Sequence, residues 1–184
     1  MSQTEIDRQL NLAWKDYSKI VRMEEADING VCQCVSCGNK HLWDGYRGIM
    51  QAGHYYPARD IRSALQFCRR DIHPQCRRCN AMGIATQWNP NATRAVVDVS
   101  NNYRHWMLKH YGQELLEELR SLDKHTLDWD ADLAAEWRAD CMAAMKKLKA
   151  ARADAIEWDT CEMIGNYTPD LPAEVFRKGS DRIP

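Results

Sequence analysis

The sequence lacks any long hydrophobic run. No apolar stretch approaches the ~20 residues that a membrane-spanning helix needs, so a transmembrane protein is excluded. The polar N-terminal segment also lacks the apolar region of a secretory signal peptide, and we therefore expect a cytoplasmic protein. Internal repeats and low-complexity tracts are absent as well. The 184 residues, of which 45% are hydrophobic and 28% charged, are typical of one globular domain with appendages.

The net charge of −1 conceals an uneven distribution along the chain. Residues 40–80 carry eight basic and three acidic side chains, a local charge of +5. Residues 113–184 carry ten basic and sixteen acidic side chains, a local charge of −6. This asymmetry suggests a polyanionic partner for the middle of the chain, although a solvated surface of mixed charge is the commoner cause of such a pattern.

Apolar residues recur at three- and four-residue spacing in residues 4–26, 101–121 and 130–158. This periodicity predicts three helices with one apolar face each, the second broken at Gly112. The apolar faces of the first and last of these helices either pack within their own domain or form the interface of a homodimer. Residues 31–80 are rich in Cys, His and Gly and have poor helical periodicity, which favours short strands and loops organised by a metal.

Two Cys-x-x-Cys pairs, Cys34/Cys37 and Cys76/Cys79, are the strongest motif. In a reducing compartment, closely spaced cysteine pairs indicate metal ligands rather than disulfides. Zinc prefers four tetrahedral ligands, and thiolates three residues apart in a tight turn can bind one ion from a single segment. We therefore predict one structural zinc held by these four thiolates. Cys32 offers an alternative ligand to Cys34, whose spacing from Cys37 suits the turn better.

Histidine and asparagine side chains lie inside or beside the segment that this zinc would close. His54 follows a small-residue stretch, His73 precedes Cys76 by three positions, and Asn80 follows Cys79 directly. An imidazole can deprotonate water near neutral pH, and such side chains can also bind a divalent cation that stabilises charge on a phosphate. The residues alone are equally compatible with a catalytic site and with a structural or DNA-binding zinc module.

An ordered set of motifs runs through the first half of the chain: DYSKIVR at 16–22, CQCVSCG at 32–38, QAGHY at 51–55, DIHPQC at 71–76 and CN at 79–80. In these motifs the sequence resembles the NinG (Rap) recombination endonucleases of lambdoid phages, and more broadly the zinc-containing HNH, or ββα-metal, endonucleases. It is also similar to the Holliday-junction resolvase of T-even phages. The resemblance covers roughly residues 10–122.

The resemblance implies roles for four side chains in or directly beside the segment between the two cysteine pairs. His54 would be the general base, and Asn80, at the start of a helix, would bind a catalytic Mg²⁺ or Mn²⁺. Asp71 stands where the middle Asn of HNH proteins usually braces a loop. Many HNH enzymes place a metal-binding Asp before the base, whereas this chain has Gly53, so His73 is the candidate replacement ligand.

We therefore expect a mainly α fold with a small β-hairpin, in which a zinc-clamped, HNH-like ββα-metal centre is flanked by helices. Its expected parts are an N-terminal helix (1–30), the zinc-clamped HNH-like nuclease domain (31–122), a C-terminal helical extension (123–164) and a loosely ordered tail (165–184).

The expected activity is metal-dependent hydrolysis of phosphodiester bonds in DNA. The resemblance implies branched recombination intermediates as substrates, the host cytoplasm as location, and a possible homodimer. Six arginines are expected to contact phosphates: Arg59, Arg62, Arg69, Arg70, Arg77 and Arg78. Two alternatives remain open, a zinc-dependent DNA-binding protein without catalysis and an HNH endonuclease that cuts ordinary duplex DNA.

Overall fold

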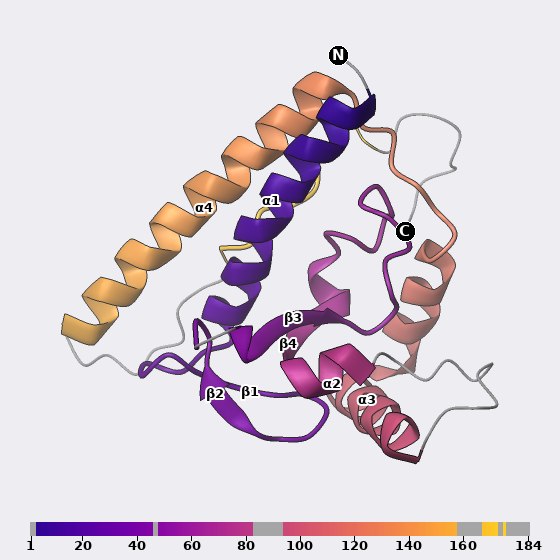
Figure 1. Cartoon of the computed structure of the whole chain (residues 1–184), viewed down its shortest axis with the longest axis vertical. Coiled ribbons are helices and arrows are strands. Elements are labelled where there is room, and N and C mark those ends of the chain that lie inside the picture. The colour runs from indigo at the N-terminus through magenta and orange to yellow at the C-terminus, as the bar shows by residue number, and fades with distance from the viewer. Residues whose placement is uncertain (1–2, 46–47, 83–93, 158–166, 173–174, 176–184) are drawn as a thin grey trace.

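Two long helices, α1 (Gln3–Glu24) and α4 (Ala131–Glu157), lie side by side along one flank of the molecule (Figure 1). The computed structural model describes residues 3–45, 48–82, 94–157, 167–172 and 175. The two helices run parallel, because Arg138 donates to Gln9 near their beginnings and Arg152 donates to the carbonyl of Met23 near their ends. The guanidinium of Arg152 thus also places a positive charge at the carboxyl end of α1, where the helix dipole favours it.

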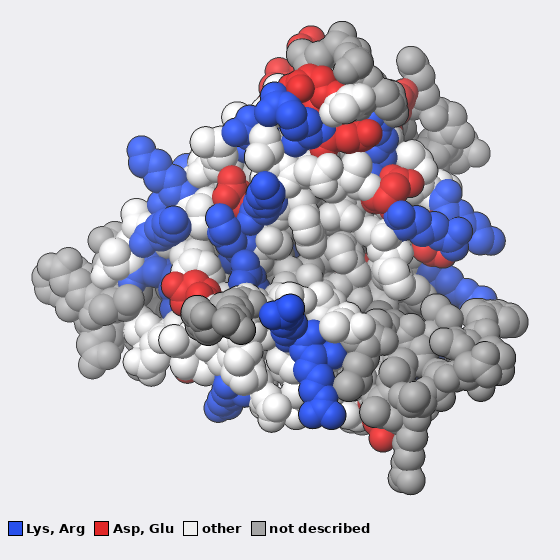
Figure 2. Space-filling view, in the orientation of Figure 1, with Lys and Arg blue, Asp and Glu red and all other residues white. Residues whose placement is uncertain are grey.

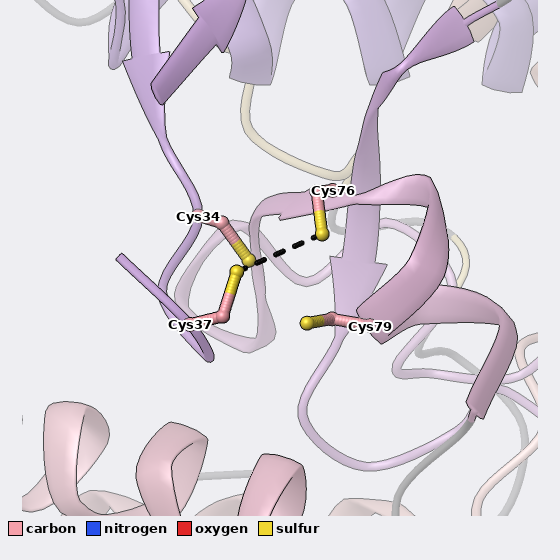
Figure 3. A group of neighbouring side chains, drawn as sticks. All are labelled: Cys34, Cys37, Cys76 and Cys79. Carbon is pink, nitrogen blue, oxygen red and sulfur yellow. Dashed lines mark hydrogen bonds between the residues drawn. The ribbon is translucent and has the colours of Figure 1, made fainter. Parts of the chain in front are cut away.

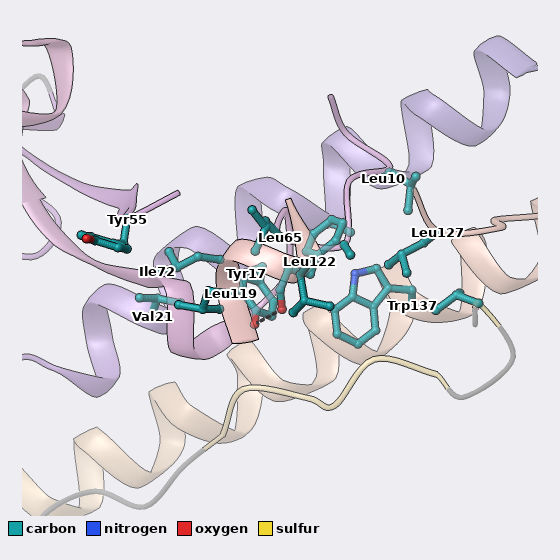
Figure 4. Packing of buried hydrophobic residues seen from close by; sticks show 14 of the residues in the cluster. Leu10, Tyr17, Val21, Tyr55, Leu65, Ile72, Leu119, Leu122, Leu127 and Trp137 are labelled. Carbon is teal, nitrogen blue, oxygen red and sulfur yellow. Dashed lines mark hydrogen bonds between the residues drawn. The ribbon is translucent and has the colours of Figure 1, made fainter. Parts of the chain in front are cut away.

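The apolar faces of α1 and α4 are buried within the chain. Leu10, Tyr17 and Val21 of α1 and Trp137 of α4 are fully covered, and the rings of Tyr17 and Trp137 lie 5.9 Å apart (Figure 4). The two helices predicted from periodicity therefore form at the expected places, with ends that differ by one or two residues. Of the two roles considered for their apolar faces, the structure shows packing inside the domain.

The third long helix, α3 (Arg94–Leu122), begins earlier than predicted and is kinked at the predicted glycine. Gly112 has a φ of 80° and a ψ of 178°, and residues with a side chain rarely adopt this positive φ. Tyr103, Met107 and Leu119 bury the inner face of α3 against the shared core. None of the helices in the described part of the chain combines the length and the apolar character needed to cross a membrane.

The insert between α1 and α3 contains two small antiparallel sheets rather than the single hairpin expected. β1 (Val31–Gln33) pairs with β2 (Lys40–Leu42) around the first cysteine pair. β3 (Met50–His54) pairs with β4 (Ile72–Cys76), and the short helix α2 (Arg77–Met82) follows β4 directly. A 3-10 helix, η2 (Arg69–Asp71), leads into β4. The chain is thus mainly helical with two small sheets.

One hydrophobic cluster joins the insert to all three long helices. Leu65 and Phe67 of the β3–β4 connection are buried beside Tyr17, whose hydroxyl donates to the Phe67 carbonyl at 2.6 Å. Val175, which lies in the tail expected for residues 165–184, also belongs to this cluster. It is 1% exposed, and the Asp128 N–H donates to its carbonyl at 2.9 Å. Residues 165–166, 173–174 and 176–184 lie outside the described part, so the loose order of the tail stays a prediction.

Candidate metal centre and catalytic site

The four predicted cysteine ligands converge on one point. The sulfurs of Cys34, Cys37, Cys76 and Cys79 all lie within 4.8 Å of one another, and those of Cys37 and Cys76 are 3.8 Å apart (Figure 3). A zinc ion bound tetrahedrally at about 2.3 Å from each sulfur needs sulfur–sulfur distances of about 3.8 Å. The arrangement therefore fits a tetrahedral zinc site and links the first cysteine turn to the junction of β4 and α2.

The backbone around the first cysteine pair forms the tight turn that such a site needs. Gly38 has a φ of 75° and donates its N–H to the carbonyl of Cys34 at 2.9 Å. Burial raises the pKa of the Cys76 thiol, but the Cys79 N–H and the neighbouring thiols outweigh burial, and the net direction is downward. Burial raises the pKa of the Cys34 and Cys79 thiols, so the lowered pKa belongs to Cys76 and not to the ligand set as a whole.

Cys32, the alternative ligand, is not one of the four cysteines whose sulfurs converge. Its thiol donates to the carbonyl of Arg22 at 2.9 Å. Burial raises its pKa to about 12, so it remains a thiol at neutral pH. Of the two candidate thiols, the structure thus brings Cys34, and not Cys32, to the other three cysteines.

The register of β3 and β4 divides the remaining candidates between two faces of the hairpin. Gly53 pairs with His73, and His54 pairs with Ile72. Paired residues of an antiparallel ladder share a face, and successive residues alternate. Gly53 and His73 therefore share one face with Gln75, whereas His54 and Ile72 point to the other, towards α1.

His54 is the last residue of β3 and packs against α1. Its ring stacks on Trp14 with centroids 5.1 Å apart, and its Nε2 lies 3.3 Å from the carbonyl oxygen of Gln66. Burial lowers the pKa of His54 to about 4, so the ring is neutral at neutral pH. Because a carbonyl oxygen only accepts, Nε2 of the neutral ring carries the proton and Nδ1 carries the lone pair.

Asn80, in the second turn of α2, lies against the opposite face of the hairpin. Its amide nitrogen donates to Gln51 Oε1 at 2.8 Å, and its oxygen would be 3.0 Å from a Cβ built on Gly53. The oxygen of Gln75 would be only 2.0 Å from that Cβ, and Gln75 is held in place by a 2.6 Å hydrogen bond to Ser36. The structure thus brings Asn80 to Gly53, not to the ring of His54.

His73 is enclosed by protein groups. Its Nδ1 lies 2.8 Å from Glu25 Oε1 and its Nε2 lies 3.2 Å from the carbonyl of Arg70. Trp106 of α3 covers the ring at a centroid distance of 4.4 Å, and only 1% of the residue is exposed. Both nitrogens face oxygen acceptors, so a metal bound to His73 would first have to displace Glu25 or the Arg70 carbonyl.

Asp71 lies beneath the turn that follows His54. Its Oδ1 accepts the N–H of Tyr56 at 2.8 Å, and its backbone carbonyl accepts the N–H of Tyr55 at 2.8 Å. Burial raises the pKa of this carboxyl well above its ordinary value, and Oδ2 has no hydrogen-bond partner among the described residues. These contacts are those of a loop brace.

Four of the six predicted DNA-contacting arginines form ion pairs inside the chain. Arg59 and Arg62 pair with Asp123 and Asp7, both at 2.8 Å, and Arg70 pairs with Glu118. Arg69 bridges Glu24 at 3.0 Å and Glu25 at 2.8 Å. Arg77 and Arg78 are exposed, with no carboxylate partner in the described residues. Basic side chains are scattered among acidic ones on the face shown in Figure 2.

Sequence reasoning missed the amides and the carboxylate that hold these candidates. Gln51 orients Asn80, Gln75 bonds to Ser36 beside the cysteine turn, and Glu25 contacts His73. Gln75 carries one usable signal, since it stands two positions from His73 and so shares its face, whereas Gln51 stands three positions from His54 and carries none. Glu25 carries none, because its contact to His73 spans 48 positions along the chain.

Comparison with known proteins gives one match. The family described as "Bacteriophage Lambda NinG protein" matches residues 7–151, most of the chain. No curated protein and no solved structure matches the chain significantly.

Proposed function

Because the chain belongs to the family of the bacteriophage lambda NinG protein, we propose that it is an endonuclease that hydrolyses phosphodiester bonds in DNA. Its proposed substrates are branched recombination intermediates in the host cytoplasm, such as Holliday junctions and forks. The observation that carries the proposal is the placement of His54 at the end of β3, where its Nε2 faces the carbonyl oxygen of Gln66 at 3.3 Å and burial lowers the pKa of the ring.

His54 would act as the general base. Its Nδ1 would take a proton from water, and the resulting hydroxide would attack phosphorus. The bond from phosphorus to the leaving oxygen would break with its electron pair on that oxygen, which would take up a proton from solvent water. The Gln66 carbonyl then faces the Nε2–H of an imidazolium, which strengthens their hydrogen bond. An approaching phosphate raises the low pKa of His54, because a nearby negative charge favours the protonated ring.

The four-cysteine zinc would serve folding rather than chemistry. A closed site with four protein ligands leaves no position for water, and its binding energy stabilises the folded insert. Cys76 and Cys79 flank the start of α2, so the ion fixes the residue that follows, Asn80, beside Gly53.

The proposal includes a catalytic Mg²⁺ or Mn²⁺, which Asn80 Oδ1 would hold together with His73 or Asp71. The described residues do not form a second preassembled group of metal ligands beside the cysteines, and the nitrogens of His73 already face acceptors. The ligand role proposed for His73 therefore requires that ring to move. Exposed Arg77 and Arg78 are the proposed phosphate contacts on α2. A homodimer would nick two strands of a junction, through a surface other than the buried faces of α1 and α4.

A DNA-binding protein without catalysis is the second candidate, and one observation favours it. The ring of His54 is packed on Trp14 on one face of the hairpin, while Asn80 lies against the other. In this conformation the proposed base and the proposed metal ligand are not directed at one common point. A structural histidine needs no such convergence.

Cleavage assays distinguish the candidates. Labelled four-way junction, Y-fork and linear duplex are incubated with the zinc-loaded protein, with Mg²⁺ and with EDTA. The proposal requires magnesium-dependent cutting of the branched substrates and a loss of ~10²–10⁴-fold in His54→Ala. His73→Ala tests the proposed ligand role, because excess Mg²⁺ or Mn²⁺ should partly restore activity when a metal ligand is lost. His125→Ala, which removes an exposed imidazole outside the proposed site, is the matched histidine control. Cutting by His54→Ala at the wild-type rate refutes the mechanism, and no cutting by the unmodified protein supports the binding-only candidate.

A further inference from the structure

The surface between the first cysteine turn and α3 is hollowed. This hollow encloses about 600 Å³ and lies between residues of the turn, among them Gln33, Ser36 and Gly38, and one side of α3. Asn102, Trp106 and Lys109 stand on that side at helical spacing, so they form one face. The volume is that of a site for a small organic group such as a nucleotide. None of the six arginines predicted to contact DNA lines it.

The α3 residues that line the hollow include a base and no acid. Lys109 is the basic side chain among Asn102, His105, Trp106, Lys109 and His110. Lys109 and His110 are exposed. Glu25 is the one carboxylate that lines the hollow, and it is paired with Arg69 at 2.8 Å. The exposed ammonium of Lys109 therefore suits an anion.

An aromatic platform lies at one end of the hollow. The rings of Trp106 and His110 are stacked with centroids 4.1 Å apart and an angle of 21° between their planes. The ring of Trp106 also packs on the buried ring of His73, with centroids 4.4 Å apart, so the Trp106–His110 pair is held against the core. His110 is exposed and presents its outer face to solvent. A rigid aromatic ring beside basic side chains binds an unpaired base by stacking and its phosphate by charge.

We infer that this hollow binds an unpaired nucleotide of single-stranded DNA, with the base stacked at His110 and the backbone near Lys109. The inference rests on the proposed function, and it deepens it by naming the element of a branched substrate that the chain would recognise. A paired base is excluded by its own stacking neighbours, so the site would distinguish a fork or a gapped junction from continuous duplex.

The test measures binding and does not depend on cutting. Zinc-loaded full-length protein is titrated, in magnesium-free buffer, into two fluorescein-labelled strands of equal length: an oligothymidylate and a strand of abasic residues. Both carry the same charge, so their difference in affinity reports stacking alone. We expect the wild type to bind oligothymidylate roughly 10-fold more tightly than the abasic strand.

The variant is Lys109→Ala with His110→Ala, and the chain offers a matched control. Lys124 and His125 form the same exposed dipeptide outside the hollow. We expect the first double variant to lose the preference for bases and to bind both strands more weakly. We expect Lys124→Ala with His125→Ala to behave as the wild type. Equal affinity of the wild type for both strands overturns the inference, and so does an equal loss in the control.

Failure of this inference and failure of the nuclease proposal give different results. A protein that prefers oligothymidylate but cuts no junction retains the nucleotide site and loses the catalytic assignment. A protein that cuts junctions but binds both strands equally retains the catalytic assignment and loses the nucleotide site.

Discussion

Replacing Gly53 by alanine tests how tightly the hairpin is packed against α2. A Cβ at this position would lie 2.0 Å from Gln75 Oε1 and 2.8 Å from Gln75 Cδ. The Gln75 amide must then move until the separation reaches at least the 3.4 Å of ordinary contact. That movement breaks its hydrogen bond to Ser36, which is 2.6 Å long and buried.

The cost follows from these contacts. A buried hydrogen bond whose groups are left without partners costs about 1–3 kcal/mol, and forcing extra volume into a packed region costs about 1–3 kcal/mol more. We expect Gly53→Ala to lower the free energy of unfolding by about 2–6 kcal/mol, a large share of typical domain stability. Ser36 stands between Cys34 and Cys37, so zinc should also be released more readily.

Urea unfolding and transfer of zinc to a chromogenic chelator measure the two effects. Ser36→Ala is the matched variant, because it removes the same hydrogen bond without adding a Cβ. If loss of the Gln75–Ser36 hydrogen bond causes the effect, the variant with both Gly53→Ala and Ser36→Ala should lose less unfolding free energy than the two single variants together, by about 1 kcal/mol. A change of less than about 0.5 kcal/mol in Gly53→Ala, with zinc retained, would refute this account of the glycine.

Three other predictions concern the metal, the DNA contacts and pH. Cys34→Ala should lose zinc by elemental analysis and unfold the insert, whereas Cys32→Ala should retain it, because Cys32 lies outside the cluster. Changing Arg77 and Arg78 together to alanine should reduce the log–log salt slope of DNA binding by roughly 2, and an unchanged slope would remove them from the interface. Asp71→Asn should be more stable than the wild type at neutral and alkaline pH and similar at acid pH in denaturant titrations. Burial raises the pKa of Asp71, so its stabilising contribution is present below the unfolded pKa near 3.8 and lost as pH rises through the folded value. A parallel pH dependence of the two proteins would exclude that cause.

The helices and the zinc ligands could be predicted because each depends on a local rule. An amphipathic helix repeats every three to four residues, and α1 and α4 follow this period over more than five turns. Zinc binding by a Cys-x-x-Cys turn depends on equally local residues, and the fold has only to bring the two turns together. Gly112 carried its own signal, since a glycine inside a helical pattern marks a permitted break.

The environment of the candidate catalytic residues could not be predicted, because it depends on strand register. Shifting β3 by one position would exchange the faces of Gly53 and His54, and the sequence sets that register only through contacts distant along the chain. His54 packs on Trp14, 40 positions earlier, and Gln75 bonds to Ser36 across 39 positions. The same register explains why the Asp expected before the base is absent: a carboxylate at position 53 would meet the oxygens of Gln75 and Asn80.

The charge asymmetry of the sequence has a second explanation in the structure. Arg59 and Arg70 of the basic insert pair with Asp123 and Glu118 of the acidic C-terminal region. The acidic C-terminal region therefore supplies part of the negative charge that the basic insert was expected to find in a polyanionic partner. A DNA strand that recruited these arginines would have to replace existing ion pairs. Each new phosphate contact would then exchange one exposed ion pair for another, and the binding free energy would change little. The acid-free stretch 99–113 has no such internal competitor in its own sequence, so Lys109 has more to gain from a phosphate.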